Sequence, residues 1–218
     1  MCVAVGFARE PYRPQINPAN FRVGVNHPYF QLKPGTVSRY VEKGGGETSE
    51  SEVTVTHDTK TIMGVKCTVV REIVTRKGQL IEDTCDWYAQ DKAGTVWHFG
   101  QATEEFKAGG AVDIKGSWEA GINGQPGISM PADPKPGPPY LEDYSPNNAE
   151  DMAQIVAINE TVSVPAGTFT GCVKIRDWSL LESGTEYKWY AKDIGIVQTR
   201  STGGQMEALI SIKRVSSN

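Results

Sequence analysis

Short runs in which apolar and polar residues alternate are the feature that most limits what this chain can fold into. In one such run Met206, Ala208 and Ile210 alternate with Glu207 and Ser211. A period of two is typical of a strand with one buried face. Glycine-containing turns separate the runs, and short turns of this kind join antiparallel neighbours. We therefore predict an all-β fold, a mainly antiparallel curved sheet or open barrel.

Two parts of the chain also resemble each other. The residues CTVVRE at 67–72 are matched by CVKIRD at 172–177, and WYAQD at 87–91 is matched by WYAKD at 189–193. Similar residues at similar spacing predict that the sheet is built from two related β units. A chance likeness between two hairpins is the alternative.

The expected organisation is one continuous domain in four parts. Proline restricts its own backbone and that of the residue before it, so we expect the proline-rich start to wrap over the surface without pairing in a sheet. The parts are an extended leader at 1–35, a first β unit at 36–120, a Pro/Gly-rich loop at 121–145, and a short helix with the second β unit at 146–218.

The one short helix is predicted from Pro146 to Gln154. Ser145 is a suitable N-cap, and proline suits the first helical position. Glu150 and Asp151 lie in the early turns, where carboxylates interact favourably with the helix dipole.

Composition excludes several classes of function. Lys and Arg number 22 against 26 Asp and Glu, a net charge of -4, which does not fit a nucleic-acid binder. No apolar run reaches the ~20 residues of a membrane-spanning helix, so no transmembrane segment is predicted. Phosphate-loop, dinucleotide and nucleophile-elbow motifs are missing from the sequence, and we predict no cofactor.

The first eight residues, MCVAVGFA, fit the tail of a signal peptide. Cys2 is alternatively a lipid-anchored terminus, and a short strand is the third interpretation. The other cysteines are expected to be buried thiols. A hairpin closed at residues 76–79 would place Cys67 opposite Tyr88 and Cys85 opposite Val70, so the thiols would not face each other.

The chain resembles a family of exported bacterial proteins of unassigned function. Four motifs support the resemblance: Asn26-His27-Pro28-Tyr29-Phe30, Pro34-Gly35, Asp86-Trp87-Tyr88-Ala89 and Gly116-Ser117-Trp118-Glu119. In the first motif, His27 is an insertion between the asparagine and the proline that are adjacent in the family. It implies export and an all-β fold, and no activity. The segments at 164–169, 189–191 and 194–197 are similar to periplasmic half-barrels of the lipoprotein-carrier kind, which bind apolar ligands in a curved sheet.

Aromatic residues near carboxylates are the richest candidate site, because flat rings and acids suit sugars and other amphipathic ligands. The alternative is that the aromatics fill the core. The candidate ligand-binding residues are Tyr88, Trp97, Trp118, Tyr140 and Tyr144. For an enzyme acting on a glycosidic bond, the candidate catalytic residues are Glu119 with either the second carboxylate, Glu104, or the imidazole of His98.

Metal sites are weaker hypotheses. His27, His57 and His98 lie far apart in sequence, and a structural role for His98 is favoured. Asp83, Asp86 and Asp91 could hold calcium, but a solvated hairpin edge explains them better, and no metal is predicted.

The leading hypothesis is a secreted or periplasmic protein that binds an amphipathic small molecule, lipid or glycan in a cavity of the curved sheet. The alternatives are a carbohydrate-active hydrolase or lyase and a structural or interaction module. The sequence leaves open whether the protein is an enzyme, and it leaves the oligomeric state open too.

Overall fold

The computed structural model describes residues 12–214, and nearly all of their regular structure is β-strand, which confirms the all-β prediction. The only helical turn in this range is a 3-10 turn, η1 (Pro18–Asn20). Among the same residues, no helix is long and apolar enough to cross a membrane.

The strands fall into two groups along the chain. Those of the first half are β1 (Phe21–Arg22), β2 (Val25–His27), β3 (Phe30–Leu32), β4 (Thr36–Gly44), β5 (Glu47–Ile62), β6 (Val65–Arg76), β7 (Gln79–Asp91) and β8 (Val96–Phe106). Those of the second half are β9 (Val112–Asp113), β10 (Trp118–Glu119), β11 (Gly127–Met130), β12 (Tyr140–Ser145), β13 (Ala149–Val164), β14 (Gly167–Ser179), β15 (Glu186–Ala191), β16 (Gly195–Ser201) and β17 (Met206–Arg214).

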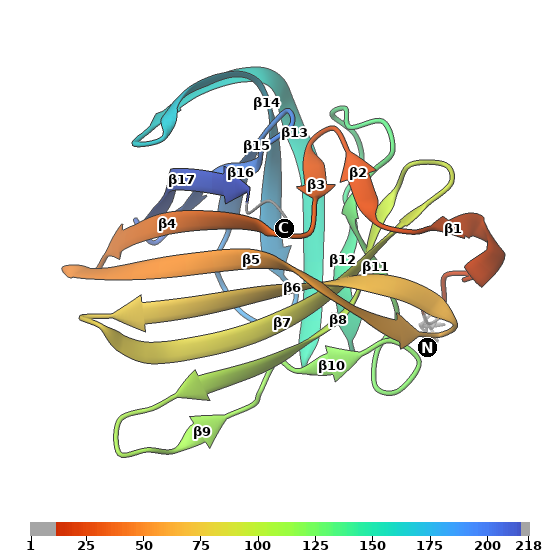
Figure 1. Cartoon of the computed structure of the whole chain (residues 1–218), viewed down its shortest axis with the longest axis horizontal. Coiled ribbons are helices and arrows are strands. Elements are labelled where there is room, and N and C mark those ends of the chain that lie inside the picture. Colours follow the sequence, from red (N-terminus) through yellow and green to blue (C-terminus); the bar gives the residue numbers. More distant parts are fainter. Residues whose placement is uncertain (1–11, 215–218) are drawn as a thin grey trace, which may run out of the picture.

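One large, strongly curved antiparallel sheet contains most of these strands (Figure 1). Its order is β10-β8-β7-β6-β5-β4-β17-β16-β15-β14-β13-β12, and β1, β9 and β11 add short pairings to β7 and β8. Strands β2 and β3 form a small second sheet. Because β4 pairs with β17, the first and last long strands lie side by side in the middle of the large sheet. The sheet does not close into a barrel.

The two ends of the large sheet approach each other at β11. This strand pairs with β8, and next to it the Gln125 N–H donates a 2.8 Å hydrogen bond to the carbonyl of Tyr144 in β12. A Cβ on Gly127 would clash with the carbonyl oxygen of Glu142, so only glycine allows this approach of the two backbones. We call this contact of residues 125–130 with β12 the seam.

The matched segments of the sequence lie in hairpins of the same register. In the β6–β7 hairpin the residue two positions after Cys67 pairs with Trp87. In the β14–β15 hairpin the residue two positions after Cys172 pairs with Trp189. Two copies of one β unit would show this correspondence; the duplication itself stays a prediction.

Three clusters of buried side chains form the core. One contains Trp87 and another contains Trp189. The third contains Tyr190, and Tyr88 and Phe30 pack against it. The ring centroid of Phe30 lies 5.1 Å from that of Tyr88 and 6.1 Å from that of Tyr190, so β3 is anchored on both matched hairpins.

The helix predicted from Pro146 to Gln154 is wrong, because β13 occupies most of that range. Residues 146–148 form a turn, in which Asn147 has a φ of 59°. The hydroxyl of Ser145, predicted to cap a helix, instead donates a 2.8 Å hydrogen bond to the Asn123 carbonyl. Pairing with β12 and β14 provides hydrogen-bond partners for the backbone N–H and C=O groups of β13. This pairing outweighs the local capping signals that favour a helix.

Two segments predicted to be irregular also contain strands. The described part of the leader holds β1, which pairs with β7, so the expectation that the leader stays out of the sheet is wrong. The loop predicted at 121–145 includes β11 and β12. These strands fall in proline-free stretches, where every N–H group is able to pair. The signal-peptide candidate at 1–8, with Cys2, lies outside the described residues.

The β6–β7 hairpin keeps its predicted register only next to the turn. One extra residue in β7, Ile81, then forms a bulge that shifts the pairing by one position. As a result Thr68, and not Cys67, lies opposite Tyr88. The described cysteines are free thiols: Cys67, Cys85 and Cys172.

Candidate functional site

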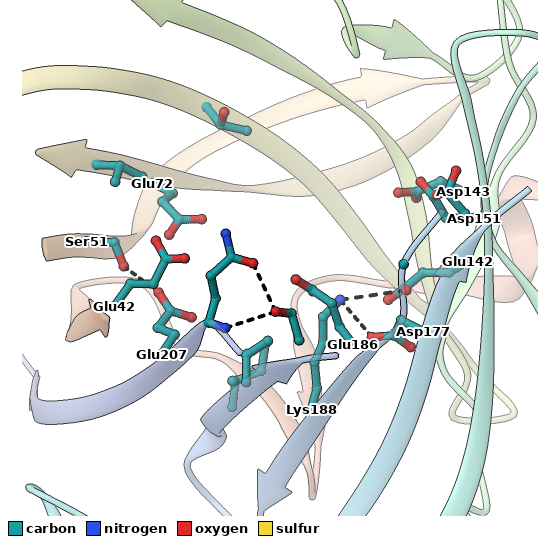
Figure 2. A pocket seen from close by; sticks show the side chains of 18 of the residues that line it. Glu42, Ser51, Glu72, Glu142, Asp143, Asp151, Asp177, Glu186, Lys188 and Glu207 are labelled. Atoms are coloured by element: carbon teal, nitrogen blue, oxygen red, sulfur yellow. Dashed lines mark hydrogen bonds and ion pairs between the residues drawn. The ribbon is translucent and has the colours of Figure 1, made fainter. Parts of the chain in front are cut away.

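A hollow of about 990 Å³ lies inside the curved sheet. Side chains of β4–β8 line one wall and side chains of β12–β17 line the other, with Phe30 of β3 and Ser129 of β11 between them. Figure 2 shows the polar side chains that point into this space. The volume is in the range of sites for small molecules.

The hollow concentrates the negative charge of the protein. Within residues 12–214, twelve of the 25 acidic residues line it, but only two of the 21 lysines and arginines, Lys188 and Arg76. The remaining described residues are correspondingly basic, with 19 lysines and arginines against 13 acids. The modest overall charge therefore hides two regions of opposite sign.

Three carboxylates form what we call the first acidic cluster: Glu42 of β4, Glu72 of β6 and Glu207 of β17 (Figure 2, left). Ser51 donates a 3.0 Å hydrogen bond to Glu207, and Ser49 donates one of 3.0 Å to Glu42. Among residues 12–214, no basic side chain forms an ion pair with any of the three. Only hydroxyls partner the cluster.

Burial and mutual repulsion make these carboxylates hard to ionise. Burial raises the pKa of Glu72 to about 8, and the charges of Glu207 and Asp86 add to the effect. Burial also raises the pKa of Glu207; the hydrogen bond from Ser51 opposes this shift, and Glu42 adds to it. A bound cation would favour the ionised forms and reverse these shifts.

Four carboxylates form the second acidic cluster: Glu142, Asp143, Asp151 and Asp177, from β12, β13 and β14 (Figure 2, right). Lys188 of β15 lies among them, with its Nζ 2.9 Å from Asp177 and 3.8 Å from Glu142. Burial disfavours the ammonium charge, but these two carboxylates hold the pKa of Lys188 well above its usual value.

One lysine does not balance this cluster. Burial raises the pKa of Glu142 to about 8; Asp177 adds to the shift and Lys188 opposes it. Burial also raises the pKa of Asp151, against a hydrogen bond from Ser179. The cluster thus keeps an excess of acid even with its lysine in place.

His98 of β8 connects the second cluster to the opposite end of the sheet. Its Nδ1 lies 2.5 Å from Asp143 of β12, and its Nε2 lies 3.2 Å from Asp86 of β7. Burial disfavours the imidazolium, but Asp143 and Asp86 raise the pKa of His98 to about 10. The ring also stacks on Tyr88, with centroids 4.7 Å apart. A charged imidazole therefore crosses the seam.

Phe30, Tyr88 and Tyr190 form an aromatic patch in the hollow, and Val74, Ile81 and Trp178 also line it. Ile196 lines the hollow as well and packs against the core cluster that contains Tyr190. The hollow is thus amphipathic, with acidic walls and a small apolar surface.

Of the predicted ligand-binding aromatics, only Tyr88 lines the hollow. Trp118 is 2% exposed in the core, and Trp97 packs against the same core and donates its indole N–H to Asp91. Tyr140 packs against the core cluster of Tyr190. Tyr144 makes an edge contact with the ring of Tyr12 at a centroid distance of 5.4 Å.

The predicted catalytic residues lie in different places. His98 lines the hollow, whereas Glu104 and Glu119 do not. Glu104 is exposed on β8, and Glu119 forms a 2.7 Å ion pair with Lys60, whose Nζ lies 3.4 Å from the centroid of a Trp87 ring. The structure therefore does not bring Glu104 or Glu119 into the hollow with His98.

The candidate calcium ligands also separate. Asp83 pairs with Arg71, Asp86 contacts His98, and Asp91 accepts hydrogen bonds from the N–H groups of its own turn. Within the described residues, no three acidic, histidine or cysteine side chains are grouped so that they could hold a metal ion.

The sequence analysis does not single out Glu72, Asp177, Lys188 or Glu207. The available signal was the alternation itself: Glu207 precedes the buried Ala208 in β17. A period of two separates two faces of a strand, but it does not say which face is concave. Glu207, at a polar position of this strand, lines the hollow.

Comparison with protein-family models, with curated proteins and with solved structures finds no match to this chain. Its function is therefore inferred from the chemistry of the hollow. Acidic walls around an aromatic patch attract cations, and they repel anions such as fatty acids and phosphates.

Proposed function

We propose that this protein binds a cationic amphipathic small molecule in the hollow of its sheet. The exported location implied by the resemblance of its sequence belongs to the same proposal. The observation that carries it is the charge imbalance: twelve acidic residues line the hollow, and Lys188, Arg76 and His98 are its basic ones.

The burial of several of these acids strengthens this selectivity. Glu72, Glu142 and Glu207 are largely removed from water, so their attraction for a cation is screened less than it would be on the surface. Concave walls of one sign also focus the field and raise the local concentration of cations. The aromatic patch offers a surface for the apolar part of the ligand and for cation–π contact.

Calorimetry with three ligands of equal chain length tests the proposal: octylammonium, octanol and octanoate. We expect octylammonium to bind at least tenfold more tightly than octanol, octanoate not to bind, and added salt to weaken the octylammonium complex. Equal affinity for all three, or preference for octanoate, would contradict the proposal.

A pair of charge-matched variants locates the site. Glu72→Gln with Glu207→Gln removes two acids from the hollow, whereas Glu52→Gln with Glu104→Gln removes two acids outside it. Octylammonium binding should weaken several-fold in the first variant and stay unchanged in the second. Equal weakening in both would mean that overall charge, and not the hollow, attracts the ligand.

The second candidate function is hydrolysis of a glycosidic bond. One observation favours it: the pKa of Glu142 is raised to about 8, as a general acid requires, and other carboxylates stand beside it. Turnover of a chromogenic glycoside that Glu142→Gln abolishes would establish this function. An interaction module remains as the third function if neither ligands nor glycosides are recognised.

A further inference from the structure

We infer that the ligand carries at least two positive charges, joined by an apolar chain, as in a linear diamine or polyamine. This inference rests on the proposed function and specifies its ligand. It follows from the placement of seven of the twelve acids of the hollow, which form the two acidic clusters; Glu186, between the clusters, is one of the other five.

The two acidic clusters lie on opposite sides of the hollow. Figure 2 shows Glu42, Glu72 and Glu207 at one side and the second cluster at the other, with Lys188 between them. Lys188 contacts only the second cluster, through Asp177 and Glu142. A ligand with one positive charge would therefore leave one side of the hollow without its countercharge.

Ser129 supplies a second observation, independent of the acids. It lines the hollow on β11 and is 2% exposed, and its Oγ has no hydrogen-bond partner among the described residues. A buried hydroxyl is normally partnered, since leaving one unpaired costs free energy. Ser129 is the extra residue between Ile128, which pairs with Trp97, and Met130, which pairs with Val96. Its oxygen is thus available to accept a hydrogen bond from an ammonium group.

A metal ion does not suit this arrangement. Metal ions need several ligands that converge on one point, and the described residues contain no such group. Ammonium groups are less demanding, because a carboxylate and a hydroxyl suffice for each one. The aromatic patch of Phe30, Tyr88 and Tyr190 would contact the methylene chain between the two charges.

Calorimetry with octylamine and octane-1,8-diamine isolates the second charge, because the two ligands have the same chain. We expect the diamine to bind at least tenfold more tightly and with a steeper dependence on salt. A series from butane-1,4-diamine to decane-1,10-diamine should show an optimum length.

The variant Glu72→Gln with Glu207→Gln should abolish the advantage of the diamine, and its folding is checked by thermal unfolding. Glu52→Gln with Glu104→Gln is the matched control and should keep the advantage. Ser129→Ala should weaken diamine binding several-fold. Loss of the advantage in the first variant alone would support the inference.

Equal affinity for amine and diamine would overturn this inference and leave the proposed function standing. An advantage that survives Glu72→Gln with Glu207→Gln would overturn it too, because the second charge would then bind elsewhere. Failure of both ligands to bind would overturn the proposed function and, with it, the inference.

Discussion

The two acidic clusters face one hollow, yet they are stabilised in different ways. The second has its own cations, since Lys188 reaches two of its carboxylates and His98 reaches Asp143. Among the described residues, the partners of the first are the hydroxyls of Ser49 and Ser51. The fold therefore supplies cations to one cluster, which still keeps an excess of acid, and residues 12–214 supply none to the other.

This difference separates structure from binding within a single site. Removing a cation from the second cluster should destabilise the protein, because buried carboxylates would lose their partner. Removing an acid from the first should stabilise it and weaken ligand binding. Binding sites often lower stability in this way.

The largest effect is expected for Lys188→Met. This change leaves Asp177 and Glu142 buried without their cation, which should lower the free energy of unfolding by about 3–5 kcal/mol. Urea unfolding measures it. Lys192→Met, at an exposed lysine in the next turn, is the control and should change stability by less than about 0.5 kcal/mol. Equal losses would show that Lys188 does not neutralise the cluster.

The second largest effect is expected for His98→Asn. This change breaks the charged link across the seam, and it should lower the free energy of unfolding by about 2–4 kcal/mol at pH 7. The folded pKa of His98 is raised from 6.5 to about 10, so its stabilisation is complete below pH 6.5 and is lost as the pH rises through 10. The difference in unfolding free energy between wild type and variant should therefore shrink from pH 7 to pH 10. His57→Asn, at an exposed histidine, should show no such trend.

A smaller effect of opposite sign is expected for Glu72→Gln. The folded pKa of Glu72 is raised from 4.5 to about 8, so wild-type stability should fall as the pH rises through this range. The variant should be about 1–2 kcal/mol more stable than wild type at pH 9 and nearly equal to it at pH 5. Glu104→Gln, at an exposed acid, is the control. A variant less stable than wild type at pH 9 would mean that Glu72 has a cationic partner.

The smallest effect is expected for Glu119→Gln, outside both clusters. Its ion pair with Lys60 is partly exposed, so the loss should stay below about 1 kcal/mol. Amine affinity should not change. A large loss of affinity would place a ligand beside Glu119 and would remove the distinction between the hollow and the outer surface.

Local patterns in the sequence predicted much of the fold. Alternation predicted the strands, and the two WYA segments predicted hairpins that turn out to share a register. The helix at 146–154 failed because capping signals are local, whereas β13 is held by neighbours on both sides. The bulge at Ile81 has no signature in the sequence, and it moved the pairing of Cys67.

The sequence predicted less of the candidate site than of the fold. Tyr88 and His98 were singled out and line the hollow; of the acids around them, Asp86 was assigned to a solvated hairpin edge, and neither acidic cluster was predicted as a site. In the sequence, the pattern around a carboxylate at a polar strand position is the same whether that side of the sheet is convex and faces solvent or concave and lines the hollow. Curvature and the pairing of β4 with β17 decide which it is, and both depend on contacts between distant parts of the chain.

The meeting of β4 with β17 also has a consequence for biosynthesis. During translation the first half of the sheet emerges with one edge of β4 unpaired, and β17, the strand that pairs with this edge, is made only after β5–β16. Phe30 of β3 likewise cannot stack on Tyr190 until that residue has been made. The hydrogen bond from Gln31 to Asp193 joins residues that are 162 positions apart. Such nonlocal topology slows folding and leaves an unpaired strand open to aggregation, so a nascent chain of this protein is a natural client for a chaperone.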